Sequence, residues 1–407
     1  MAVLGCLMAL AIVGGRLLVP ADGDISRFVV AGDAYVDPAT VDPPIHVIDD
    51  SWGYDGQFFW RLAVDPTEWA KEREHGALLD ASYRPPRLGY PLLAWGMAGG
   101  HAPWVATTLV AVNVLAFGAV AGLGALIAQR AQRPPLVGLL VATTPGLVFA
   151  LARDLSDVVA LAALLAGVVA LQRGRPGWAT AAWVGAVATR EQALVVIAGY
   201  GLWRVVTVAQ TWRRSRLVPT VPAPEGRCIQ RPSGAGTEEG SVAGFGVADL
   251  PWLLPPVVVA GLQMLVWARV GELPYIDAQD SNFTYPFGAL GPALWDWVRG
   301  DTQPWDDVVP FQFGLAVALV VLAFKHGREL LPEPDRWLLV SLALVVALAV
   351  SFGVKVWDGP SDLRQVLDVI ALSWVILLTT PRRMPPWLMG AAGIVWLATA
   401  AMRSYVI

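Results

Sequence analysis

One short stretch concentrates reactive side chains in a chain that is otherwise apolar. Residues 49–66, "DDSWGYDGQFFWRLAVDP", place the carboxylates of Asp49, Asp50 and Asp55 among large aromatic side chains. A carboxylate that loses hydration among aromatic rings at a membrane surface is expected to have a raised pKa, closer to the range of a general base. The alternative is an aromatic belt at the level of the lipid headgroups, with Asp55 capping a turn at Gly56. The residue types alone favour neither interpretation.

Two arginines follow in "SYRPPRLGYP", residues 82–91. The two prolines between Arg84 and Arg87 favour a polyproline II helix, whose three residues per turn would project both guanidinium groups to one side, about 9 Å apart. Guanidinium groups are suited to phosphate oxygens. Anchoring of both side chains to lipid headgroups is the simpler alternative.

Arg190 is the most conspicuous single charge, because "ATREQAL" lies between two apolar runs. An ionisable residue at membrane depth is energetically expensive and usually functional. An ion pair with another helix is the alternative. Adjacent residues do not face each other on a helix, so Glu191 is not expected to be its only partner.

Further charges lie at two expected helix starts. Asp154 and Asp157, in "ARDLSDVVAL", would share one face if both were helical, and they either cap that helix or form a polar wall of an outer cavity. Arg364 and Asp368, in "DLRQVLDV", have the i,i+4 spacing of a local ion pair. Arg364 is nevertheless a candidate for binding an anion.

The elements that would position these residues are membrane helices. Hydrophobic residues make up 56% of the chain and charged residues only 15%, whereas soluble domains carry about 25% charged residues. The sequence predicts an all-α, polytopic helical membrane protein with about eleven spanning helices. We expect them near residues 1–20, 102–128, 136–151, 156–172, 178–189, 192–207, 249–268, 309–324, 337–354, 364–379 and 386–402.

The placement of arginine predicts the orientation. The loops that follow every second helix are rich in arginine, which is typical of a cytoplasmic face. This assignment requires two short helices, 178–189 and 192–207, that meet at "TREQ" rather than one long tilted helix. A broken helix at membrane depth needs a cavity or protein around it. The outer face then receives the loop 21–87, with thirteen acidic against six basic residues.

Three regions are expected along the chain. An N-terminal membrane module, 1–207, includes a catalytic loop, 21–101. A Pro-, Gly- and Ser-rich stretch, 208–248, predicts a disordered cytoplasmic linker. The C-terminal helices, 249–407, include an outer loop, 269–308. The sequence has no P-loop, no dinucleotide-binding glycine motif and no basic stripe for nucleic acid.

The motifs resemble those of the GT-C glycosyltransferases, and most closely bacterial relatives of the mannosyltransferases of the GPI-anchor pathway. "YDGQFFWRLAVDP" resembles the family's aromatic-Asp motif, with Asp55 in the position of the acid. "YRPPRLGYPLLAW" resembles the arginine-bearing segment before the second spanning helix, and "ATREQAL" resembles the Thr-Arg-Glu motif. The likeness covers residues 1–205. The sequence departs from the family pattern at "RPPR", where a more helical segment is expected. It also lacks an Asp-x-Asp motif, which leaves metal dependence open.

The resemblance implies a membrane glycosyltransferase of the plasma (inner) membrane, with its active site outside the cytoplasm. Direct displacement with one carboxylate predicts that the anomeric configuration inverts. The donor would be a polyprenyl-phosphate sugar, with mannose one candidate, and the acceptor a glycan, lipid or protein. Asp55 and Asp50 would be catalytic, and would also be the ligands of any Mg²⁺ or Mn²⁺. The expected substrate-binding residues are Asp49, Tyr54, Gln57, Arg84, Arg87, Tyr90, Asp154, Asp157, Arg190, Glu191 and Arg364.

Two other functions remain open. A transporter or flippase of a lipid-linked or anionic solute would use the same arginines, with ionisable residues near the middle of the bilayer. A non-catalytic membrane scaffold would have no pocket joining Asp55 to the arginines. The position of Arg190 relative to Asp55 distinguishes these functions from an enzyme.

Overall fold

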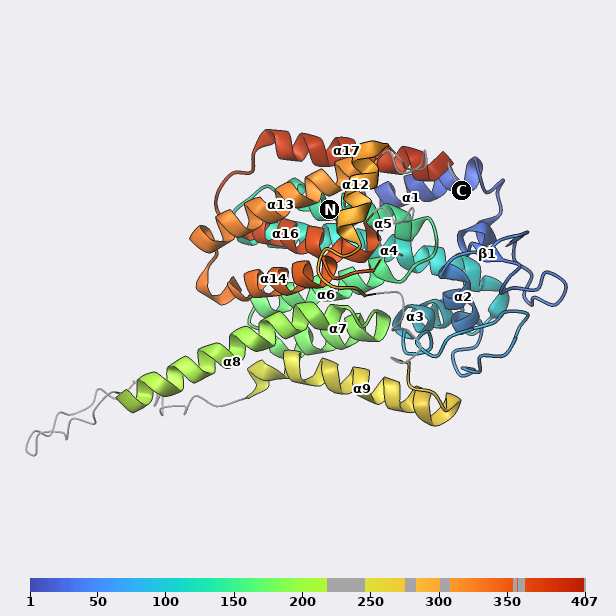
Figure 1. Ribbon diagram of the computed structural model, residues 1–407, viewed down its shortest axis with the longest axis horizontal. Helices are drawn as coiled ribbons and strands as arrows, with labels where there is room; N and C mark the ends of the chain where they lie inside the picture. Colours follow the sequence, from blue (N-terminus) through green and yellow to red (C-terminus); the bar gives the residue numbers. More distant parts are fainter. Residues whose placement is uncertain (218–245, 275–282, 301–307, 354–356, 358–362, 406–407) are drawn as a thin grey trace, which may run out of the picture.

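The chain is built almost entirely of helices (Figure 1). The computed structural model describes residues 1–217, 246–274, 283–300, 308–353, 357 and 363–405. Four described helices are long and apolar enough to cross a membrane: Ala102–Arg130, Ala193–Arg213, Val247–Val270 and Val309–Leu330. Three shorter apolar helices are Ala2–Leu18, Asp157–Gln172 and Pro386–Met402. These helices indicate a membrane protein, but the count of eleven spans is not confirmed.

The helices of the first half agree with the expected segments in most places. The expected span 136–151 is instead a 3-10 helix followed by a separate short helix, with Pro145 at the start of the second. The segment 178–207 does divide at the expected position, between α7 and α8. The helices are α1 (Ala2–Leu18), α2 (Gly56–Val64), α3 (Gly89–Met97), α4 (Val105–Arg130), α5 (Pro145–Leu151), α6 (Asp157–Gln172), α7 (Pro176–Thr189) and α8 (Ala193–Leu217), with 3-10 helices η1 (Ile25–Phe28), η2 (Ala102–Trp104) and η3 (Pro135–Val141).

The second half adds helices that pack beside the first. α8 continues to Leu217, beyond its expected end at residue 207, so the first residues of the expected linker are helical. Residues 218–245 of that linker lie outside the described residues. The helices are α9 (Leu250–Val270), α12 (Leu290–Arg299), α13 (Val309–Leu330), α14 (Trp337–Ala349), α16 (Leu367–Thr379) and α17 (Pro386–Tyr405), with 3-10 helices η4 (Val247–Asp249), η6 (Glu333–Asp335) and η7 (Arg364–Val366).

Small residues allow these helices to approach closely. A Cβ atom added at Gly5 of α1 would lie 2.6 Å from the Cβ of Ala121 in α4. One added at Gly199 of α8 would lie 2.2 Å from the hydroxyl of Ser341 in α14, which donates to the carbonyl of Val196 at 2.7 Å. Such contacts are typical of helices that pack in a membrane, where close van der Waals contact replaces the hydrophobic effect.

The expected catalytic loop forms a small structured layer at one end of the helices, where Figure 1 shows β1, α2 and α3 together. The two strands β1 (Ala31–Gly32) and β2 (Val47–Ile48) are parallel. All residues of α2 are buried. Gly56, its first residue, lies so close to the backbone that an added Cβ would be 2.5 Å from the carbonyl oxygen of Arg153. This contact fixes Asp55, the residue before α2, against the turn that precedes α6.

Candidate functional site: a buried arginine–carboxylate network

Asp55 lies at the centre of an ion-pair network. It is the residue before α2 and uses no side-chain bond to cap that helix. One carboxylate oxygen accepts from Arg84 at 3.1 Å, and the other from Arg364 at 3.3 Å. Arg84 is positioned in turn by Asp80, at 2.7 Å, and by the ring of Phe58, whose centroid is 3.3 Å from the guanidinium carbon. The capping alternative for Asp55 is therefore wrong, and two guanidinium groups hold its carboxylate.

The break between α7 and α8 supplies the second part of the network. Arg190 forms an ion pair with Asp157, and its guanidinium also donates to the side chains of Gln192, at 2.8 Å, and Gln365, at 2.6 Å. Glu191 pairs instead with Arg87, which donates two bonds of 2.6 and 3.0 Å to its carboxylate. The expectation that Glu191 is not the sole partner of Arg190 is confirmed.

Arg364 joins the two parts. It comes from η7, in the second half of the chain, and its guanidinium lies between Asp55 and Asp157, 3.6 Å from the second carboxylate. Its guanidinium carbon is also 5.4 Å from the ring centroid of Tyr54. No ion pair to Asp368 is formed among the described residues, so the predicted local pair is wrong. The i,i+4 spacing failed because Arg364 precedes α16, and its side chain turns toward the first half.

Charge controls the proton affinity of Asp55. Burial alone would raise the pKa of its carboxyl group, but Arg364, Arg84 and Arg87 outweigh burial and lower it to about 2. The expected rise of this pKa is therefore wrong, because it was based on the aromatic neighbours of Asp55 in the sequence, whereas spacing along the chain did not place the three arginines near its carboxylate. Burial would also raise the pKa of Glu191, and the ion pair with Arg87 lowers it instead.

The network leaves little free space. A cavity beside Asp55 is lined by Phe58, Phe59, Leu62, Arg84 and Arg87, and its volume is about 10 Å³. That is room for about one water molecule. A ligand larger than water therefore requires these side chains to move, and Arg84 and Arg87 would exchange carboxylate contacts for contacts with the ligand.

The segment with Arg84 and Arg87 differs from the polyproline II helix that was expected. The backbone N–H of Arg87 donates to the carbonyl of Arg84 at 3.1 Å, which closes a turn. Both guanidinium groups nevertheless face the same site, and both lie near the ring of Tyr83, at 5.0 and 5.4 Å. The shared direction was predicted correctly, although its geometric reason was not.

Two predicted acidic residues lie away from the network. Asp49 and Asp50 are exposed, and Asp50 has a positive φ of 51°. The backbone N–H of Asp50 donates to Asp33 at 2.9 Å, so this residue is part of a surface turn. Within the described residues, no group of three or more His, Cys, Asp or Glu side chains could hold a metal ion. A divalent cation shared by Asp50 and Asp55 finds no support in this arrangement.

Three further predicted residues have structural roles. Gln57 accepts from the backbone of Gly32 at 3.1 Å and so ties α2 to β1. The hydroxyl of Tyr90 donates to the carbonyl of Leu109 at 3.0 Å, inside the core. Asp154 is buried, with a φ of 48°, and does not share a face with Asp157, because it lies in the turn before α6.

Other residues of the site were not predicted. Gln365 and Gln192 bind Arg190, and the guanidinium carbon of Arg153 lies 4.0 Å from the ring centroid of Phe149 and 5.8 Å from that of Tyr54. The signal for both glutamines was their position beside the charges in "TREQ" and "LRQ". An amide next to a charge in an apolar segment is itself a candidate partner.

The fold and the site together define a class: a helical membrane protein with a network of four arginines and four carboxylates at a helix break. No model of a known protein family matches the chain, and no curated protein matches its sequence significantly.

Proposed function

We propose that the protein is a membrane glycosyltransferase that transfers a sugar from a polyprenyl-phosphate donor to an acceptor outside the cytoplasm. The observation that carries this proposal is the position of Asp55 between the guanidinium groups of Arg84 and Arg364. Arg87 lines the same cavity, and Arg190 is joined to Arg364 through Asp157. One proton acceptor and several phosphate-binding groups thus belong to one network, as the reaction requires.

The donor phosphate would take over guanidinium contacts that Asp55 now makes. Asp55 is the carboxylate best placed to be displaced, because its ion pairs are 3.1 and 3.3 Å long, whereas Glu191 binds Arg87 at 2.6 Å. Its side chain is 29% exposed, whereas that of Asp157 is 3% exposed. A carboxylate released from cationic partners becomes more basic. Asp55 would therefore act as a base only when the donor is bound.

The transfer itself would be a single displacement. The acceptor hydroxyl oxygen attacks the anomeric carbon and its proton passes to the Asp55 carboxylate. The bond between the anomeric carbon and the phosphate oxygen breaks, and its electron pair stays on the polyprenyl phosphate. Arg84 and Arg364 stabilise the charge that develops on the leaving phosphate. The anomeric configuration inverts, because one face of the sugar is attacked as the other is vacated.

The test uses purified protein in lipid vesicles with radiolabelled polyprenyl-phosphate mannose, glucose or arabinose, and a total envelope extract as the acceptor source. The wild-type protein should transfer label from one of these donors. Asp55→Asn should lower the rate on the order of 10²-fold or more. Asp50→Asn is the matched control and should retain activity, since Asp50 is exposed and outside the network. Full activity of Asp55→Asn would remove Asp55 from the mechanism.

The alternative is a transporter or flippase for a lipid-linked or anionic solute. The closed network favours this alternative in one respect, because gates of transporters also have to open before a ligand enters. Translocation needs the arginines but no proton acceptor. The measurement is the flipping of a fluorescent polyprenyl-phosphate sugar across the bilayer of vesicles that contain the protein. Transport is favoured over transfer if Asp55→Asn still flips this lipid and Arg364→Ala does not.

A further inference from the structure

A large cavity lies apart from the arginine network. It is lined by residues of η1, of the segment 43–46, of α2 and of the region where α4 begins, and its volume is about 390 Å³. Small-molecule sites typically measure about 300–1,000 Å³. The cavity therefore has room for a ligand, in contrast to the closed space beside Asp55.

Helix α2 separates the two cavities. Trp60 of α2 lines the large cavity, whereas Phe58, Phe59 and Leu62 of the same helix line the cavity beside Asp55. A helix is about 10 Å across with its side chains. The large cavity thus lies behind the helix whose start carries Asp55.

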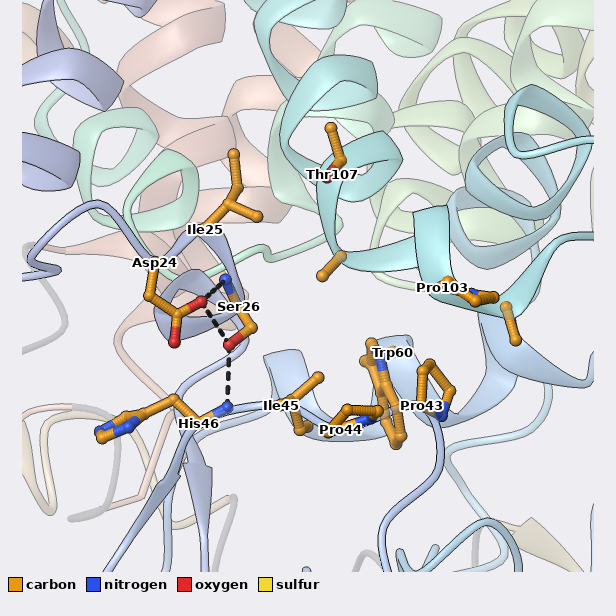
Figure 2. A pocket seen from close by; sticks show the side chains of 12 residues that line it. Asp24, Ile25, Ser26, Pro43, Pro44, Ile45, His46, Trp60, Pro103 and Thr107 are labelled. Atoms are coloured by element: carbon orange, nitrogen blue, oxygen red, sulfur yellow. Dashed lines mark hydrogen bonds between the residues drawn. The ribbon is translucent and has the colours of Figure 1, made fainter.

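One wall of the large cavity is polar and rigid (Figure 2). One oxygen of Asp24 accepts from the backbone N–H of Ser26 at 2.9 Å and from its hydroxyl at 2.7 Å. The Ser26 hydroxyl in turn accepts from the backbone N–H of His46 at 2.8 Å. No hydrogen bond within the described residues uses the other oxygen of Asp24, and this residue is exposed, so that oxygen is free to accept from water or from a ligand.

The opposite wall is mostly apolar. Figure 2 shows Ile45, Pro44 and Pro43 along one side of the cavity, next to Trp60, with Thr107 across from them. The ring nitrogen of Trp60 is buried and has no hydrogen-bond partner among the described residues. Trp60 is fully buried, so its ring lies behind the apolar wall and its N–H is out of reach of a ligand in the cavity.

The chemistry of these walls selects the ligand. No arginine or lysine lines the cavity, which disfavours a phosphate group. A sugar has hydroxyl groups on its edge and C–H groups on its faces, and so matches a cavity with one hydrogen-bonding wall and one apolar wall. We propose that this cavity binds a neutral sugar residue, with Asp24 as a hydrogen-bonding residue and the prolines and Ile45 against the apolar face of the sugar. That this sugar belongs to the acceptor rests on the glycosyltransferase function proposed above.

The test measures binding directly, without any transfer reaction. The full-length protein is placed in lipid nanodiscs, because maltoside detergents carry sugars themselves. Mannotriose, maltotriose and cellotriose are the probes, and saturation-transfer NMR reports which sugar protons lie against the protein. We expect at least one trisaccharide to bind, with a Kd in the millimolar range, and its binding to weaken at least 10-fold in Ala106→Leu and in Asp24→Asn.

Two variants make the result specific. Ala106→Leu fills the cavity from α4, whereas Asp24→Asn keeps an oxygen that can cap η1 and replaces the unused oxygen with an amide nitrogen. Asp22→Asn, an exposed neighbour outside the cavity, should bind sugar as the wild type does. Binding unchanged in both cavity variants, or absent for all three sugars, would overturn the proposal. The proposal of a neutral sugar would also be overturned if phosphoethanolamine bound to this cavity more strongly than any of the three sugars.

The same variants separate this proposal from the proposed function. Asp55→Asn should retain sugar binding while it loses transfer, because Asp55 lines the other cavity. If the cavity holds the acceptor, Ala106→Leu should raise the acceptor KM at least 10-fold with little change in kcat. If the wild-type protein binds sugar but transfers none, the proposal of a sugar-binding cavity stands and the proposed glycosyltransferase function is refuted.

Discussion

At the scale of single residues, the site depends on which carboxylate each arginine contacts. Asp55 shares its charge between Arg84 and Arg364, and Asp157 shares its charge between Arg364 and Arg190. Each of these charges is partly or fully withdrawn from water, so that removing one leaves its partners uncompensated. The two carboxylates differ in exposure, and this difference predicts different effects of substitution.

The first prediction concerns the pH dependence of stability. The pKa of Asp55 is about 2 in the folded protein and 3.8 as its ordinary value. A lowered pKa stabilises the fold above the ordinary value, and this contribution is lost as pH falls from about 4 to 2. The contribution is at most ~2 kcal/mol, because the side chain is partly exposed.

Thermal unfolding in nanodiscs, followed by tryptophan fluorescence between pH 2 and 7, measures this contribution. Asp55→Asn should reduce the dependence of Tm on pH between 4 and 2, and Asp50→Asn should leave it as in the wild type. An unchanged pH profile in Asp55→Asn would mean that the arginines do not hold this carboxylate in its charged form.

The second prediction compares two carboxylates that each bind an arginine of the network. Asp157→Asn removes the buried charge between Arg190 and Arg364 and should destabilise the protein by about 3–5 kcal/mol. Asp80→Asn removes a 29% exposed partner of Arg84 and should cost less than ~1 kcal/mol. Denaturant unfolding of both variants checks the difference, and equal effects would show that burial does not set the strength of these ion pairs.

At the scale of elements, the contact of α3 with the end of α7 positions the helix break. A Cβ atom added at Gly89 would lie 2.2 Å from the hydroxyl of Thr189, the residue before Arg190. α3 also follows directly after the turn that carries Arg84 and Arg87. One close approach thus aligns two segments of the network.

The third prediction follows from this approach. Gly89→Ala should push α3 away from α7, cost about 1–3 kcal/mol through overpacking and lower the proposed transfer activity. Gly96→Ala is the matched control in the same helix, since nothing lies within 4 Å of its added Cβ. The control should be neutral or stabilise by ~0.5–1 kcal/mol. Thermal unfolding and transfer assays should therefore separate the two variants, and identical behaviour would refute the packing argument.

At the scale of the whole molecule, the two halves of the chain meet at both ends of the helices. Arg364 and Gln365 join the first half at the network. At the other end, Arg133 donates to the carbonyl oxygens of Thr380 and Arg382, in the connection between α16 and α17. The second half is therefore held against the first at two separate places.

The fourth prediction tests the contact of Arg133 with the connection between α16 and α17. Arg133→Ala leaves two carbonyl groups without their donor and should loosen the exposed connection after α16. Trypsin should then cleave after Arg382 or Arg383 several-fold faster than in the wild type. Arg336→Ala removes only an exposed ion pair with Glu333 and should leave that cleavage rate unchanged. Equal cleavage in all three proteins would show that Arg133 does not hold this connection in place.

The sequence by itself determined the helical class and most of the charged candidates. Hydropathy is a local property, so apolar runs and the break at "TREQ" were visible without coordinates. Charges such as Asp55, Arg84 and Arg190 were conspicuous because a charge is expensive in apolar surroundings.

Only the tertiary structure decided which of these charges meet. Asp157 enters the network and Asp154 does not, because the backbone turns between them, and spacing along the chain does not specify that turn. Arg364 pairs across the molecule rather than with Asp368 because packing of the second half brings Asp55 and Asp157 within its reach. The sign of the pKa shift of Asp55 followed from the same cause, since electrostatic energy depends on distances in space and not on neighbours in sequence.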